Sequence, residues 1–136
     1  MPALVAVGEA AIAPTPPLTL RLAGAGRFGS ARHPQVLWTG LEGDVRALAE
    51  LAVRLRDGVG PLKLPVEDRP FRAHLTLGRW RPGHPADGTL STRLAGYRGP
   101  EWSVAEVRLL ESHLGPTPTY DVVASFATRR IPEGRA

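Results

Sequence analysis

The chain has 136 residues, a formal net charge of +4, four histidines and no cysteine. This length allows one domain with its own core, and the lack of cysteine excludes disulfides and thiolate metal sites. The first thirteen residues are mostly apolar, but they contain Glu9, lack a basic leader and run into prolines, so we expect no signal peptide or membrane span. These features together predict a cytoplasmic protein.

Arginine makes up 16 of the 17 basic residues, with Lys63 the exception. The planar guanidinium group suits phosphate better than an ammonium group does. A coding bias toward GC-rich codons would also enrich arginine, together with the abundant alanine, glycine and proline. The arginine content alone therefore leaves both explanations open.

The first half of the chain predicts a helix, two strands and a second helix. Residues 3–12 favour a short helix that ends at the following prolines. Alternation at residues 18–22 predicts a strand. Residues 24–29 match the G-x-G-x-x-G pattern of dinucleotide-binding proteins, but a strand around residues 36–38 follows instead of a helix. We therefore reject that match and interpret the segment as a glycine-rich hairpin connection. Residues 44–56 repeat apolar side chains at helical spacing.

The second half is richer in strand patterns. A short helix is expected at residues 90–97, weakened by glycines. Strands around residues 107–109 and 120–126 are separated by a Gly-Pro-Thr-Pro connection at residues 115–118, which predicts a hairpin. Short strands with few helices between them favour an α+β fold with a mainly antiparallel sheet.

Residues 71–79 alternate between two kinds of side chain, which is typical of a half-buried strand. One face is apolar: Phe71, Ala73, Leu75 and Leu77. The other is polar or small: Arg72, His74, Thr76 and Gly78. An imidazole beside a hydroxyl can hold a phosphate oxygen while it moves a proton. We expect His74 and Thr76 to face an open cleft and the leucines to pack on the core.

This stretch resembles the second signature of the 2H phosphoesterase family, whose members carry two His-x-Thr-x motifs. His74, Leu75, Thr76 and Leu77 match one motif. The later segments 107–112 and 115–120 also fit, and the resemblance extends from residue 17 to residue 126. The chain is most similar to the branch of bacterial RNA 2′,3′-cyclic phosphodiesterases, once named 2′-5′ RNA ligases. Ala73 departs from the proline expected before the histidine.

The resemblance implies a LigT-like bilobal fold, with a mainly antiparallel sheet around a cleft and one His-x-Thr-x strand in each lobe. Residues 1–136 would form a single domain of this type. His33, His84 and His113 each lack a hydroxyl residue two positions later. The first motif is therefore expected upstream of Met1, which would make the chain N-terminally incomplete, through a misplaced start or a true loss.

The family activity implied for this chain is the hydrolysis of a terminal 2′,3′-cyclic phosphate of RNA to a 2′-phosphate, a step of RNA processing that needs no cofactor or metal. His74 would be the general base and the histidine of the other motif the acid. Thr76 would hold a non-bridging oxygen, and Arg72 is a candidate phosphate clamp. Substrates would be RNA ends or nucleoside 2′,3′-cyclic phosphates, and the chain as given would be impaired.

Several alternatives accompany this interpretation. His74 would be merely structural if it were partly buried and bonded to Thr76. The chain would otherwise be a non-catalytic RNA or nucleotide binder, or would have 2′-5′ RNA ligase activity. No histidine pair has metal-ligand spacing, and no Gly-x-Ser-x-Gly elbow is present. Arg79 belongs to the apolar face unless the strand bulges after Gly78. Self-association through an exposed first-lobe surface is also expected.

Overall fold

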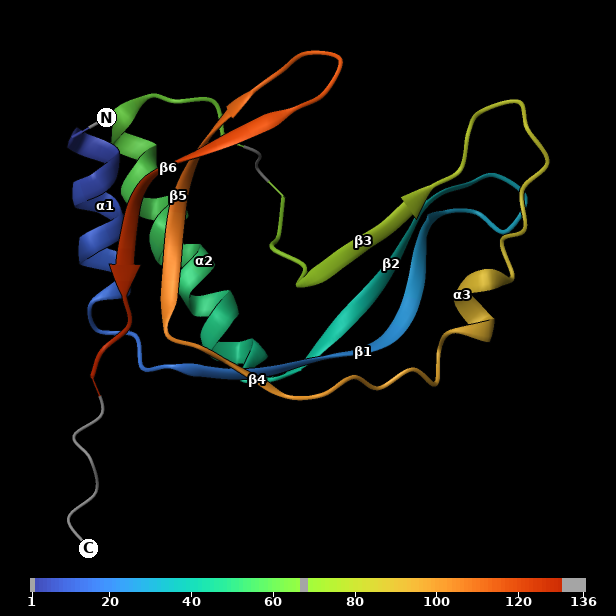
Figure 1. Ribbon diagram of the computed structural model, residues 1–136, viewed down its shortest axis with the longest axis horizontal. Coiled ribbons are helices and arrows are strands. Elements are labelled where there is room, and N and C mark those ends of the chain that lie inside the picture. Colours follow the sequence, from blue (N-terminus) through green and yellow to red (C-terminus); the bar gives the residue numbers. More distant parts are fainter. Residues whose placement is uncertain (1, 67–68, 131–136) are drawn as a thin grey trace, which may run out of the picture. The chain divides into compact units, whose positions relative to one another are not determined.

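The computed structural model describes residues 2–66 and 69–130, which combine helices with antiparallel strands (Figure 1). This combination confirms the predicted α+β class. The chain divides into two compact units, each assembled from segments that are distant in sequence. The first unit takes in residues 1–18, 46–71 and 103–136, and the second takes in residues 19–45 and 72–102. Within the described ranges, none of the helices has the length and apolar character needed to cross a membrane.

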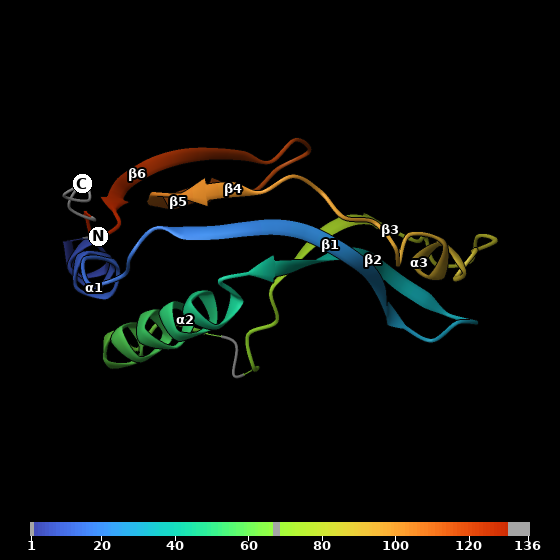
Figure 2. The same cartoon turned by 90° about the horizontal axis from the view of Figure 1, so that it is seen from below.

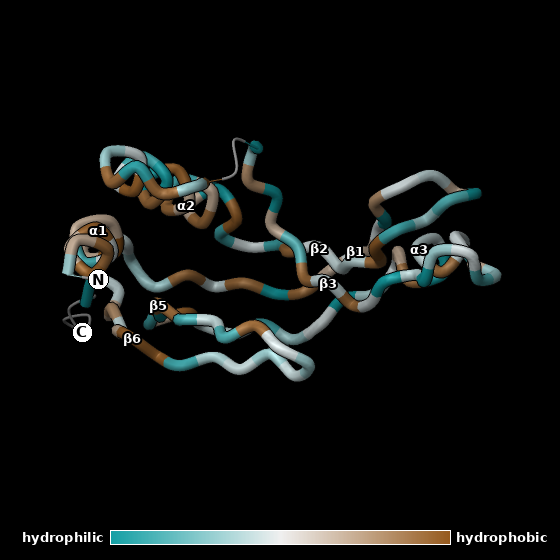
Figure 3. The backbone as a smooth tube through the Cα atoms, turned by 90° about the horizontal axis from the view of Figure 1, so that it is seen from above, coloured by the Kyte–Doolittle hydropathy of each residue, from teal (hydrophilic) through white to brown (hydrophobic). Residues whose placement is uncertain are grey.

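Two helices, a short 3-10 turn and a hairpin make up the first unit. They are α1 (Pro2–Ile12), α2 (Val45–Val59), η1 (Gly60–Leu62), β5 (Glu106–His113) and β6 (Thr119–Ala127). The helices predicted at residues 3–12 and 44–56 and the C-terminal hairpin are therefore confirmed, each with longer bounds. In Figure 3 the tube of α2 alternates between hydrophobic and hydrophilic colours, as expected for a helix with one face on the core.

The core of the first unit joins both helices to the hairpin. Its buried members are Ala11, Ile12, Leu51 and Phe126. The ring of Phe126 lies directly over Gly8, where a Cβ atom would stand only 2.4 Å from a ring carbon. Arg54 of α2 donates a hydrogen bond of 3.3 Å to the carbonyl oxygen of Ala11, close to the end of α1. The apolar side of α1 is thus fixed against its neighbours by packing and by a polar contact.

The second unit is a curled antiparallel sheet with a short helix (Figure 2). Its elements are β1 (Leu18–Gly29), β2 (Pro34–Gly43), β3 (His74–Arg79) and α3 (Leu90–Arg93), with β4 (Trp102–Val104) at its boundary. Strand β2 lies between β1 and β3 and pairs with both. The helix expected at residues 90–97 is present only as the single turn of α3.

The glycine-rich segment at residues 24–29 lies inside β1, so its interpretation as a hairpin connection is wrong. The turn between β1 and β2 falls at residues 30–33 instead. The pairing of β1 with β2 shifts between Ala23 and Gly26, and Gly24 has a φ of 69°. A glycine in the left-handed region is typical of a β-bulge, which bends a strand and increases its twist. The glycines therefore curve the sheet rather than end the strand.

Strand β3 is shorter and more exposed than its sequence pattern predicts. It begins at His74, so residues 71–73 are not part of it. Leu75 and Leu77 are each 49% exposed, and the prediction that they pack on the core is wrong. The physical reason is that, among the strands of the described ranges, β3 pairs with β2 alone and forms one edge of the sheet. An edge strand can keep the alternation of a half-buried strand while gaining little burial.

Candidate active site

The pairing of β3 with β2 shows which side chains share the face of His74. His74 lies opposite Gly40, and Thr76 lies opposite Trp38. Directly opposed residues in an antiparallel pair point to the same face of the sheet. The predicted placement of His74 and Thr76 on one face is therefore confirmed, and the face also carries Trp38.

A bulge in β3 adds Arg79 to this face. Thr76 pairs with Trp38 and Gly78 pairs with Leu37, which leaves Leu77 as the extra residue. Arg79 then pairs with Val36. Since Val36 and Trp38 are two residues apart on β2, Arg79 points to the same side as Thr76. Strict alternation predicts Arg79 on the apolar face unless the strand bulges after Gly78. The strand bulges at Leu77, one residue earlier, so Arg79 lies on the face of Thr76 instead.

The imidazole of His74 is oriented by the main chain. Its Nδ1 atom lies 2.6 Å from the carbonyl oxygen of Arg72. A carbonyl oxygen can only accept a hydrogen bond, so Nδ1 is the donor in this contact, and in the neutral form of the ring Nε2 keeps its lone pair. This tautomer presents Nε2 as an acceptor for a proton. The alternative of a partly buried His74 bonded to Thr76 is wrong, because the ring is exposed and bonds to Arg72 instead.

Two aromatic side chains flank this imidazole. The centroid of the Phe28 ring lies 5.1 Å from that of His74 at an interplanar angle of 87°, and the Trp38 ring lies 6.3 Å away at 60°. Trp38 fits there because Gly26 has no side chain: a Cβ atom at that position would lie 2.2 Å from the indole ring. These rings restrict the imidazole on two sides.

Arg72 contacts His74 through its main-chain carbonyl oxygen. It precedes the first residue of β3, so strand alternation does not fix the direction of its guanidinium group. The prediction that Arg72 shares the face of His74 therefore stays a prediction, without the support of strand alternation. Its carbonyl oxygen nevertheless contacts His74, and the residue is exposed. A role for its side chain as a phosphate clamp stays a prediction.

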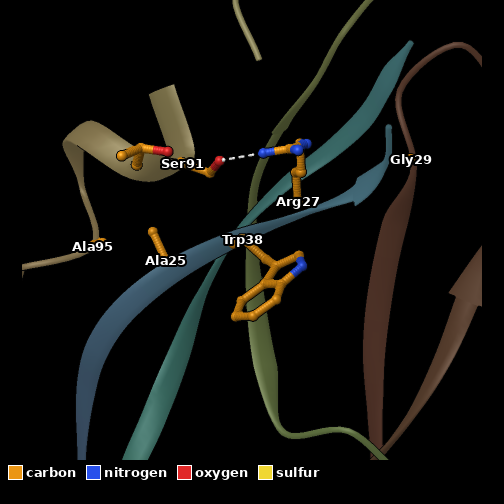
Figure 4. A pocket seen from close by; sticks show the side chains of 8 residues that line it. Ala25, Arg27, Gly29, Trp38, Ser91 and Ala95 are labelled. Atoms are coloured by element: carbon orange, nitrogen blue, oxygen red, sulfur yellow. Dashed lines mark hydrogen bonds between the residues drawn. The ribbon is translucent and has the colours of Figure 1, made fainter. Parts of the chain in front are cut away.

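Arg27 supports the sheet from the opposite side. Its Nη1 atom donates to the hydroxyl of Ser91 at 3.2 Å and to the carbonyl oxygen of Gly88 at 3.5 Å. Figure 4 shows Arg27 turned toward Ser91 while Trp38 points away from it, beside a pocket of about 400 Å³. Arg27 thereby holds α3 against the sheet, and its contacts assign it a structural role.

The other histidines are not neighbours of His74 in the second-unit sheet. His113 belongs to the first unit, where its Nε2 atom lies 2.9 Å from Oδ2 of Asp121 next to the turn of the β5–β6 hairpin. His33 and His84 line a separate pocket at the far end of β3. Neither the contacts of these residues nor their sequence context repeats the arrangement of His74 with Thr76.

Comparison with known proteins connects this face to a family. Residues 1–116 match the family model of the 2′-5′ RNA ligase superfamily. A protein of Geobacillus stearothermophilus named RNA 2′,3′-cyclic phosphodiesterase is 30% identical over 126 residues, which cover 93% of this chain and 40% of that protein. A protein of the same name from Thermus thermophilus is 30% identical, with 95% of this chain and 65% of the relative covered. The chain therefore spans less than two thirds of either relative.

Solved structures agree with this assignment. The crystal structure of the Thermus thermophilus protein TT0787 is 30% identical and superimposes with a TM-score of 0.74, covering 95% of this chain and 70% of that one. E. coli LigT, crystallised with 3′-AMP, has a TM-score of 0.70 over 95% of this chain and 68% of its own, but at 23% identity it shows the fold alone. With a family model matched over residues 1–116, a shared fold and a His-x-Thr-x strand in place, the chain belongs to the 2′-5′ RNA ligase superfamily.

Proposed function

We propose that this chain contributes one catalytic histidine to a hydrolase that opens the terminal 2′,3′-cyclic phosphate of RNA and leaves a 2′-phosphate. The observation that carries this proposal is the contact of His74 Nδ1 with the Arg72 carbonyl oxygen, which leaves Nε2 ready to accept a proton. The names of the two relatives at 30% identity support the same activity. We propose that this activity serves RNA processing in the cytoplasm, in keeping with the names of these relatives.

In the proposed mechanism, His74 acts as the general base. Nε2 takes a proton from a water molecule, whose oxygen attacks the phosphorus atom. The bond from phosphorus to the 3′-oxygen breaks, and the 2′-oxygen keeps the phosphate. Thr76, two residues along the same face, donates a hydrogen bond to a non-bridging oxygen as charge develops there. The departing 3′-oxygen needs a proton from a second group, and no metal is required for these steps.

The need for a second group, which protonates the departing 3′-oxygen, limits the turnover expected of this chain alone. His74 is the one histidine in the sequence that is followed by threonine two residues later. We therefore propose that the 136-residue chain turns over slowly, because one of two acid–base steps is unassisted. One such step is worth about 10²- to 10⁴-fold in rate. We expect kcat on a nucleoside 2′,3′-cyclic phosphate to fall below that of the Thermus thermophilus relative by a factor in this range.

The assay measures both proteins side by side under identical conditions. Equal rates would contradict the proposed impairment and would require His33, His84 or His113 to supply the second proton. No turnover at all, together with retained binding of a nucleoside 2′-phosphate, would instead favour the second candidate function, a non-catalytic RNA binder. That candidate is supported by a basic pocket in the second unit.

We also propose that the chain self-associates through the β5–β6 hairpin. Leu110 lies opposite Val122, and these residues are 50% and 54% exposed. Tyr120 follows on the same face at 62% exposure. An exposed apolar sheet face favours contact with a second copy. Light scattering is expected to give a mass above 14.6 kDa that falls toward this value in a Leu110→Glu, Val122→Lys variant.

The control for this measurement is the replacement of an exposed apolar residue outside the hairpin by glutamate. Val53 of α2 is 47% exposed and lies outside the hairpin, so Val53→Glu should leave the mass unchanged. A monomeric parent chain, or a mass that responds equally to Val53→Glu, would contradict association through the hairpin face.

A further inference from the structure

A second pocket of the second unit has a strongly basic lining. It encloses about 540 Å³ where the turn between β1 and β2 lies beside the loop that follows β3 (Figure 1). Among the described residues, three arginines, two histidines and a tryptophan line it, and no carboxylate does: Arg32, His33, Arg79, Trp80, Arg81 and His84. Guanidinium groups bind phosphate oxygens in bidentate fashion, and an indole ring offers a stacking surface for a base.

Main-chain geometry fixes both walls of this pocket. On one side, Pro82 and Gly83 form a tight turn in which Gly83 has a φ of 77° and His84 N donates to Arg81 O at 3.3 Å. On the other side, Gly29 has a φ of 92°, and a Cβ atom there would lie 2.5 Å from the His33 carbonyl oxygen. Since glycine alone enters this conformation without strain, the turns present the basic side chains in a defined arrangement.

The arginines of the pocket are available for a ligand. Within residues 2–66 and 69–130, no carboxylate lies within salt-bridge distance of Arg32, Arg79 or Arg81. Asp87 follows the loop closely in sequence, but its carboxylate accepts hydrogen bonds from Thr89 and lies 3.5 Å from Arg93. The hydrogen bonds from Thr89 are the main cause of the lowered pKa of Asp87, so this carboxylate is ionised and already paired at neutral pH.

Strand β3 leads from the face of His74 to this pocket, because the pocket lining includes the last residue of the strand. His74 is the first residue of β3 and Arg79 the last, and the bulge at Leu77 turns Arg79 to the side of His74. Five residues of strand span about 16 Å, which is a distance of a few nucleotides. A nucleic acid strand whose terminal phosphate lies at His74 would place its preceding nucleotides at Arg79 and Trp80.

We propose that this pocket binds single-stranded RNA on the 5′ side of the terminal cyclic phosphate. Arg32, Arg79 and Arg81 contact a phosphodiester of the strand, and Trp80 stacks on a base. The proposal rests on the proposed function, because the placement of the terminal phosphate at His74 decides that the RNA runs from there toward its 5′ side at the pocket. It adds a binding site for the nucleotides that precede the terminal one, so oligonucleotide ends bind more tightly than nucleoside cyclic phosphates, which do not extend from His74 to the pocket.

Fluorescence anisotropy of a 5′-labelled RNA hexanucleotide with a 3′-hydroxyl end tests this without any catalytic step. We expect Arg81→Glu and Arg32→Glu each to weaken hexanucleotide binding by about tenfold or more. The slope of log K against log salt should become shallower by about 0.7 for each phosphate that the variant no longer neutralises. Trp80→Ala should weaken binding by about tenfold, because the base loses its stacking surface. Binding of a nucleoside 2′-phosphate should not change in any of these variants.

Arg46→Glu provides the matched control, because Arg46 is exposed on α2 and makes the same charge change outside the pocket. Thermal unfolding of each variant verifies that it folds. Equal weakening by Arg46→Glu, unchanged binding in Arg81→Glu, or competition by inorganic phosphate as effective as by unlabelled hexanucleotide would each overturn the proposal. If Arg81→Glu weakens RNA binding but His74→Ala leaves turnover intact, the pocket stands and the proposed function fails.

Discussion

Replacing His74 with alanine will lower turnover of a nucleoside 2′,3′-cyclic phosphate by about 10²- to 10⁴-fold, because it removes the group that accepts the proton of water. The substitution should leave stability nearly unchanged, since the side chain is exposed and its hydrogen bond is to a main-chain oxygen that water can serve equally well. Release of the 2′-phosphate product under single-turnover conditions gives the rate, and thermal unfolding gives the stability.

His84→Ala is the control for this substitution, because His84 is also an exposed histidine of the second unit but lies in the basic pocket. His84→Ala should change the turnover of a nucleoside 2′,3′-cyclic phosphate only slightly. If His74→Ala retained the parent rate, His74 would be removed from the mechanism. If both variants lost activity equally, the base could not be assigned to β3.

Replacing Phe126 with alanine will lower the free energy of unfolding by about 3–5 kcal/mol, the cost of deleting a buried phenylalanine ring. Phe126 is only 7% exposed, and its ring covers Gly8 and contacts the core formed with Ile12 and Leu51. Alanine would leave a cavity among α1, α2 and β6 that these elements can close only in part. Urea unfolding followed by circular dichroism measures the difference.

Phe71 allows the same substitution to be made at an exposed site. It is 46% exposed, so Phe71→Ala should change the free energy of unfolding by no more than about 0.5 kcal/mol. A loss at Phe126 as small as that at Phe71 would show that the packing of α1 on the hairpin contributes little to stability.

Elements with a clear period were predictable from the sequence. The helical repeat of α2 and the alternation in β3 and β6 each follow from one segment read alone. The same applies to the shared face of His74 and Thr76, which depends only on their spacing by two residues. These features are local, so they need no knowledge of the neighbouring strand.

Features that arise from pairing between segments were not predictable. The bulge at Leu77 exists only in the register of β3 with β2, and leucine has no special preference for such a position. Phe28 and Trp38 meet His74 from two other strands, so no linear pattern connects them. The exposure of Leu75 follows from the edge position of β3, which alternation cannot reveal. In each case a single segment of sequence does not show which other strand will lie beside it.

The contact between His74 and a main-chain carbonyl also affects how the site tolerates mutation. Many proteins orient a histidine through a carboxylate side chain, which a single codon change can remove. Here every amino acid at position 72 supplies the same carbonyl oxygen. The side chain at this position can therefore vary without removing the main-chain oxygen that Nδ1 contacts. In the proposed mechanism, a change of charge at position 72 would alter the contact with the substrate phosphate while the orientation of His74 stays the same.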